Sequence, residues 1–274
     1  MERHEFLAGL HATLRPRNYL EIGVGTGLSL ALSRVPSIGV DPKFQVRTQI
    51  RTDVQLARMT SDRFFARPNP LRYLQGGRNP WRNLRHNRAS LGRIRGRATV
   101  DLGFIDGMHL FEYVLRDFMN LERYSAPSTV IVLDDMLPRN VAEAARDRST
   151  VDWTGDVYKL AGVLREYRPD VIAILVDTQP TGLLVVLLPD HANTALPDHY
   201  DEIIAANVQV DPQPVPASVL ERRDAVDPEA FLASGVWRTI ARYRRLHLPA
   251  SRLRAVVQRE VAPLLAAKDR AEGP

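Results

Sequence analysis

The sequence has no cysteine among its 274 residues and no long apolar run. A chain without cysteine has no disulfide framework, no thiolate zinc site, no iron–sulfur cluster and no cysteine nucleophile. The longest apolar runs, residues 171–176 and 183–188, are far shorter than the roughly 18 residues of a membrane-spanning helix. Residues 1–18 carry charges and lack the apolar core of a secretory signal. We therefore expect a cytoplasmic protein with no membrane partner.

Lysine is also scarce, because Lys43, Lys159 and Lys268 are the only lysines among 37 basic residues. Seven of the arginines fall within residues 78–97, in a chain of formal net charge +5. Such a cluster can contact phosphate groups, but its aromatic residues lack the regular spacing of base-stacking positions. We therefore interpret residues 78–97 as a solvated, Arg-rich insertion and do not expect nucleic acid as a partner. The arginines are Arg78, Arg82, Arg85, Arg88, Arg93, Arg95 and Arg97.

Short runs of Val, Ile and Leu without alternation predict strands that are buried on both faces of a sheet. Segments with helical spacing of apolar residues lie between several of them, at residues 28–35, 109–124 and 156–167. Strands that alternate with helices indicate an α/β fold with a doubly wound, mostly parallel, seven-stranded sheet. The predicted strands are residues 18–24, 38–40, 54–60, 100–105, 129–133, 171–177 and 183–188.

The composition changes near residue 190. Residues 189–219 are rich in Pro, Asp and Asn, and residues 227–268 have a basic, helical pattern. We therefore expect one domain over residues 1–190 and a mainly helical C-terminal appendage over residues 191–274. The helical spacing of apolar residues in this appendage also allows a homo-oligomer to form through its helices.

The predicted strands end in a glycine-rich turn or in acidic residues, and ligands of parallel sheets bind beyond these carboxyl ends. The first strand contains Glu21 and ends in a turn with Gly23, Gly25 and Gly27, and the second ends at Asp41. Glycines let the backbone approach a ligand, and an acid at the second strand can bind both ribose hydroxyls. The pattern favours a nucleoside-containing cofactor. Its third glycine comes one residue earlier than in dinucleotide-binding turns.

A second group of polar residues consists of Asp106, His109 and the pair Asp134 and Asp135. The pair follows Asp106 by 28 residues, which one crossover helix and one strand account for. Three converging carboxylates repel one another unless they bind a cation. Oxygen ligands without cysteine suit Mg²⁺ or Mn²⁺, and His109 lies within reach as a general base for a metal-bound hydroxyl.

Residues 21–27 resemble the first motif of class I S-adenosylmethionine-dependent methyltransferases, and residues 39–42 resemble the second. The resemblance covers roughly residues 15–190 and implies a Rossmann-like fold whose last two strands form an antiparallel hairpin. It implies that Glu21 and the glycines of the turn hold the methionine part of the cofactor, and that Asp41 holds the ribose. It also implies that Ser61 and Asp62 lie beside the adenine, with Asp106 bordering the cofactor.

The pattern of residues 106–135 is similar to that of metal-dependent O-methyltransferases of the catechol type and of the macrocin and mycinamicin sugar type. The catechol type has Lys and Asn where this chain has His109 and Asp135, so the sugar type fits better. The resemblance implies Mg²⁺ or Mn²⁺ on Asp106, Asp134 and Asp135, and transfer of a methyl group to a hydroxyl of a small molecule. A sugar of a glycosylated natural product is one such acceptor.

Two other functions remain open from the sequence. One is a noncatalytic nucleotide-binding protein of the same fold, although intact acids and His109 argue against it. The other is a nucleic-acid methyltransferase that uses the Arg cluster, and its affinity would fall steeply with salt. A dinucleotide-dependent oxidoreductase has the right sheet but the wrong turn spacing, and it gives the acids at 106, 134 and 135 no role.

Overall fold

The computed structural model describes residues 1–75, 98–246 and 250–271. Its described residues contain one sheet with the strand order β3-β2-β1-β4-β5-β7-β6-β8. The predicted Arg-rich insertion at 78–97 lies outside the described residues. The strands are β1 (Tyr19–Ile22), β2 (Ser37–Val40), β3 (Val54–Ala57), β4 (Leu102–Ile105), β5 (Val130–Leu133), β6 (Ile172–Val176), β7 (Leu183–Leu187) and β8 (Ala225–Val226).

The predicted fold class is confirmed. Strands β1 to β5 pair in parallel, and β7 pairs antiparallel with both β5 and β6, which is the expected hairpin. An eighth strand joins the predicted seven, because β8 pairs in parallel with β6 at Leu175–Ala225 and Val176–Val226. This strand comes from the region assigned to the appendage, so that region contributes to the sheet itself.

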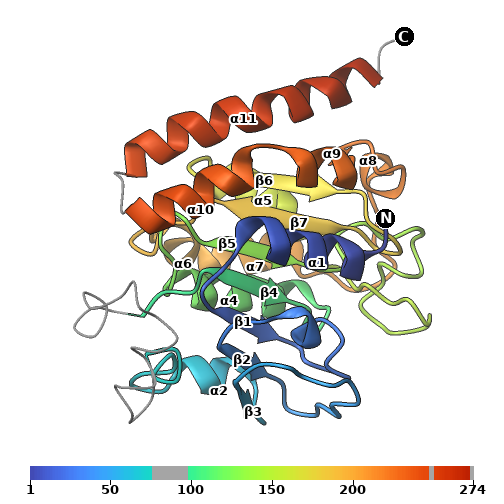
Figure 1. The fold of residues 1–274 in the computed structure, drawn as a ribbon. Helices are drawn as coiled ribbons and strands as arrows, with labels where there is room; N and C mark the ends of the chain where they lie inside the picture. Colours follow the sequence, from blue (N-terminus) through green and yellow to red (C-terminus); the bar gives the residue numbers. More distant parts are fainter. Residues whose placement is uncertain (76–97, 247–249, 272–274) are drawn as a thin grey trace.

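One face of the sheet packs against the N-terminal helix and the C-terminal helices (Figure 1). These are α1 (Arg3–Leu14), α9 (Pro228–Ala233), α10 (Val236–Leu246) and α11 (Ala250–Ala271). Most of the apolar residues that the sequence allowed as an oligomer contact are buried inside the chain itself, while Leu246 and Leu265 are exposed. The buried ones are Trp237, Ile240, Leu253, Val257 and Val261.

The opposite face packs against α2 (Ser61–Phe65), α4 (Phe111–Glu122), α5 (Lys159–Tyr167), α6 (Ala195–Asp198) and α7 (Tyr200–Asn207). Helix α4 buries Val114, Phe118 and Leu121, as the spacing of apolar residues predicts. A further short helix, α8 (Ala217–Leu220), precedes β8. No helix among the described residues is both long enough and apolar enough to cross a membrane.

The helix expected at 28–35 is much shorter than the spacing suggests. Only a 3-10 turn, η1 (Leu30–Leu32), forms there. Pro36 disfavours helical backbone at Val35, and Ser33 Oγ makes a local hydrogen bond to the Val35 carbonyl at 3.3 Å. The glycine turn therefore leads into a short, irregular connection.

The order of strands reverses between β1 and β4, which lie next to each other at the centre of the sheet. Ligands of doubly wound sheets bind at such a reversal, beyond the carboxyl ends of the strands. Here that edge carries the turn after β1 at Gly23, Asp41 after β2, Asp106 after β4 and the acidic pair after β5. The topology therefore gathers the residues that the sequence singled out.

Candidate active site

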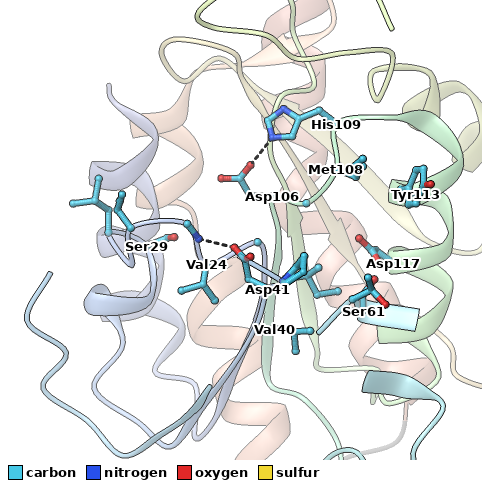
Figure 2. Close-up of a pocket in the computed structure, with 18 of the residues that line it drawn as sticks. Val24, Ser29, Val40, Asp41, Ser61, Asp106, Met108, His109, Tyr113 and Asp117 are labelled. Atoms are coloured by element: carbon cyan, nitrogen blue, oxygen red, sulfur yellow. Dashed lines mark hydrogen bonds and ion pairs between the residues drawn. The ribbon is translucent and has the colours of Figure 1, made fainter. Parts of the chain in front are cut away.

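A cavity of about 480 Å³ lies at this edge of the sheet, and its volume suits a cofactor or other small molecule. Residues from the glycine turn, from the end of β2 and from the 106–109 segment line it together. Figure 2 shows Asp41 at the cavity on the side of Val24 and Val40, with Asp106 and His109 further along. One cavity thus joins the two groups of residues found in the sequence.

Gly23 is required by the close approach of the backbone after β1 to the backbone after β4. Its φ is +89°, and a Cβ at this position would lie 1.6 Å from the Asp106 carbonyl oxygen. Its N–H donates to the Val40 carbonyl at 2.9 Å. No other residue type fits this position without a backbone shift. Gly23 therefore allows the segments after the two central strands to lie close together at the cavity.

Asp41 lines the cavity and organises the glycine turn. Its carboxylate accepts hydrogen bonds from the backbone N–H of Gly25 at 2.8 Å and of Lys43 at 2.6 Å. Carboxylate oxygens have further lone pairs, so Asp41 can also accept hydrogen bonds from a ligand. The geometry suits the predicted role in binding a ribose.

Glu21 and Gly27 do not line this cavity. Glu21 is fully buried, and its carboxyl group accepts hydrogen bonds from Tyr19 Oη at 2.6 Å and from Ser29 Oγ at 2.9 Å. Burial raises the pKa of Glu21 to about 8, although these two hydrogen bonds oppose the shift. Because Ser29 lies in the cavity wall, Glu21 touches the cavity only through that hydroxyl.

Ser61 and Asp62 begin α2 and line the opposite part of the cavity, as the resemblance implied for an adenine site. Asp62 also forms an ion pair with Arg116 at 3.2 Å. Sequence reasoning missed Asp117, whose buried side chain lies near Ser61 (Figure 2). Burial raises the pKa of Asp117 to about 7. The sequence could have pointed to Asp117, because it is an acidic residue within the apolar stripe of α4.

The second group of residues converges as expected, but the three that lie closest together include His109 in place of the predicted ligand Asp134. Ligand atoms of Asp106, His109 and Asp135 lie within 4.8 Å of one another. His109 Nε2 is 3.4 Å from Asp106 Oδ1, and His109 Nδ1 is 2.8 Å from Asp135 Oδ2. Asp134 lies beside this group and borders a small cavity of about 10 Å³ with all three.

His109 is held firmly in this position by the loop before α5. Its ring stacks on Trp153 with a centroid distance of 5.3 Å and an interplanar angle of 8°, and Nδ1 is 2.9 Å from the Trp153 carbonyl oxygen. Gly155 has positive φ, and a Cβ there would lie 1.6 Å from the His109 carbonyl oxygen. Burial alone would lower the pKa of His109, but hydrogen bonds to Asp106 and Asp135 raise it to about 11. The imidazole is therefore protonated at neutral pH in this arrangement.

Asp134 is bonded to Arg3, a residue that sequence reasoning did not assign. The Arg3 guanidinium donates to Asp134 Oδ2, and the same Nη1 atom is 3.7 Å from Asp106 Oδ2. The other oxygen of Asp134 accepts from the Asp135 N–H at 2.9 Å. Burial and the neighbouring Asp135 and Asp106 raise the pKa of Asp134 well above its usual value, against the effect of Arg3.

This donor set fits a divalent metal. Carboxylate oxygens are the preferred ligands of Mg²⁺ and Mn²⁺, and an imidazole nitrogen suits Mn²⁺ better than Mg²⁺. The small cavity among the acids has room for about one water-sized particle. The predicted ligands Asp106 and Asp135 lie together, while Asp134 is already paired with Arg3, so a metal at Asp134 has to share or displace that ion pair.

The sequence is similar to a known protein family over its first half. A family model described as a methyltransferase domain matches residues 20–136, from β1 to just past the acidic pair. This segment contains the glycine turn, Asp41, Asp106, His109 and the acidic pair. The match supports a methyltransferase domain over these residues, as the resemblance implied, and thus an enzyme. No curated protein matches the chain.

Several solved structures are similar to this one at low sequence identity. The O-methyltransferase TomG from Streptomyces achromogenes, solved with S-adenosylmethionine, is 18% identical with a TM-score of 0.43, over 68% of this chain and 79% of that chain. An O-methyltransferase from Bacillus cereus, solved with S-adenosylhomocysteine, is 16% identical with a TM-score of 0.36, over 68% and 80% of the two chains.

Proposed function

We propose that the protein is a metal-dependent O-methyltransferase that moves the methyl group of S-adenosylmethionine to a hydroxyl of a small molecule. The observation that carries the proposal is the single cavity that Asp41 and the glycine turn share with Asp106 and His109. It supports a cofactor and a proton acceptor at one site, as methyl transfer to oxygen requires.

The cofactor fits the side of the cavity near the glycine turn. We propose that Asp41 binds the ribose and that Ser61 and Asp62, which line the same cavity, bind the adenine. Glu21 supports the turn through Ser29 Oγ, while Gly23, Gly25 and Gly27 let the backbone of residues 23–27 approach the methionine part. S-adenosylmethionine supplies a methyl group that its positive sulfur already activates, so the protein needs mainly to orient and deprotonate the acceptor.

The acceptor hydroxyl is proposed to bind near the acidic group. Asp106, Asp134 and Asp135 are the proposed ligands of Mg²⁺ or Mn²⁺. A divalent cation held there would supply a positive charge that lowers the pKa of a hydroxyl group and offsets the field of the carboxylates on His109. His109 would accept the hydroxyl proton at Nε2, because its Nδ1 faces the Trp153 carbonyl and Asp135. The resemblance to the sugar type makes a sugar hydroxyl our first candidate acceptor.

Calorimetric titration with S-adenosylhomocysteine tests the cofactor site. We expect binding to the wild-type protein, and a loss of about 1.5–3 kcal/mol in Asp41→Ala, the usual contribution of a charge-assisted hydrogen bond. Asp41→Asn, which keeps one acceptor for the turn, separates ligand contact from turn stability. Asp201→Asn is the matched control, since it removes the same charge from an exposed position on α7. No binding to the wild-type protein would contradict the proposal.

A Mn²⁺ titration followed by electron paramagnetic resonance tests the metal site separately. We expect one site in the wild-type protein and its loss in Asp135→Asn, with binding of S-adenosylhomocysteine largely retained. Cofactor binding without any Mn²⁺ site would leave a methyltransferase and remove its metal dependence. Binding of cofactor and metal, but no methyl transfer to any hydroxylated acceptor, would instead favour a noncatalytic protein.

A further inference from the structure

Arg3 lies near the N-terminus of the chain, and the fold places its guanidinium beside the acidic group formed by Asp106, Asp134 and Asp135. It precedes Asp134 by 131 residues and belongs to the first turn of α1. Helix α1 is fixed by four buried residues, Phe6, Leu7, Leu10 and Leu14. The backbone N–H of Arg3 donates to the Gln179 carbonyl at 3.0 Å, which fixes the start of its side chain.

The guanidinium links two of the proposed metal ligands. It donates to Asp134 Oδ2 and lies 3.7 Å from Asp106 Oδ2. The Asp134 side chain is 1% exposed, so its ionised form is stable only with a partner inside the protein. A guanidinium stays charged at any working pH and therefore supplies that partner without a metal.

Arg3 is also free to move without unfolding its helix. Its side chain is 29% exposed and lines the large cavity, so it has space on that side. A metal that binds the Asp134 carboxylate has to compete with the Arg3 guanidinium for it. A metal that stays on Asp106 and Asp135 alone still lies next to the Arg3 positive charge. In both cases the arginine opposes binding of the cation.

We propose that Arg3 is the built-in counter-cation of the acidic group and competes with a divalent metal for Asp134. The proposal rests on the metal site of the proposed function and goes beyond it. Arg3 neutralises the acids while the metal is absent, and it leaves Asp134 for the large cavity when the metal binds. The affinity of the site for metal is therefore set partly by a residue that is not a ligand.

The test measures Mn²⁺ affinity by electron paramagnetic resonance of the free ion, which needs no substrate and no activity. We expect Arg3→Gln to bind Mn²⁺ at least tenfold more tightly than the wild-type protein. Arg3→Lys, which keeps the charge, should stay within about threefold of wild type. Arg123→Gln removes the same charge from an exposed position at the end of α4 and should leave the affinity unchanged.

A second measurement uses the unaltered protein, in case a variant folds poorly. An arginine-selective dicarbonyl reagent, with peptide mass spectrometry, reports how accessible each arginine is. We expect Mg²⁺ to increase the modification rate of Arg3 and not that of Arg123. An affinity of Arg3→Gln equal to or weaker than wild type, or an unchanged rate at Arg3, overturns the competition. If Mn²⁺ binds neither wild type nor Arg3→Gln, the metal site itself is refuted as well.

Discussion

Glu21 provides a prediction about stability that can be worked from the structure. Its carboxyl group is fully buried, and burial raises its pKa from 4.5 to about 8. Between these two pH values the folded protein keeps the proton while the unfolded chain has lost it. Loss of this proton favours the unfolded state, so the free energy of unfolding is highest below pH 4.5 as far as Glu21 is concerned. It falls as the pH rises toward 8.

The magnitude follows from the difference between the two pKa values. One pKa unit corresponds to about 1.4 kcal/mol, so the shift amounts to roughly 3–5 kcal/mol of lost stability across this range. Glu21→Gln has the same shape and does not titrate. Its amide can still pair with Tyr19 Oη and Ser29 Oγ, because each hydroxyl both donates and accepts. The variant should therefore become progressively more stable than wild type as the pH rises.

Urea unfolding of both proteins from about pH 5 to pH 9 measures this difference directly. Other titrating groups are common to both proteins and largely cancel, including Asp106 and Asp41, whose charges contribute to the shift. Glu166→Gln, at an exposed position on α5, controls for the loss of one carboxyl group. A difference between wild type and Glu21→Gln that does not change with pH would refute a buried carboxyl group with a raised pKa.

Two further predictions concern packing. Gly23→Ala should cost more than about 3 kcal/mol of unfolding free energy, because positive φ and the approach of the Asp106 carbonyl both oppose a side chain; wild-type-like urea unfolding would contradict this. Trp237→Ala should cost about 3–5 kcal/mol, because the indole is fully buried and its Nε1 donates to the Phe231 carbonyl at 2.8 Å. A loss below about 1 kcal/mol would mean that α10 is detachable, as a separate appendage would be.

The positions of β1 to β7 were predictable from the sequence, because buried parallel strands are continuous apolar runs. Strand β8 was not, since two residues carry too little pattern to be recognised. The C-terminal helices were predicted as helices, but the place of their apolar faces was not. Spacing shows that a helix has an apolar face, and it does not show whether the partner is α1 or a second chain.

The candidate site likewise contains some residues that were predictable from the sequence and some that were not. Residues at the ends of strands, such as Asp41 and Asp106, were predictable because the topology of a parallel sheet gathers them at one edge. Asp117 could have been noticed as an acid in an apolar stripe. Arg3 carries no signal of its own, because its role depends on where α1 packs, and that is decided by residues far along the chain.

The charges at the acidic group explain why Arg3 matters for the chemistry as well as for the fold. Asp106, Asp134 and Asp135 bring three carboxyl groups to one point, and Arg3 and His109 are the cations beside them. The two cations offset most of the charge of the three carboxylates, but His109 is then an acid and cannot accept a proton. A divalent metal that draws carboxylate charge to itself would release the imidazole for that task. The metal dependence that we propose would therefore mean a change of partners among residues that are already paired.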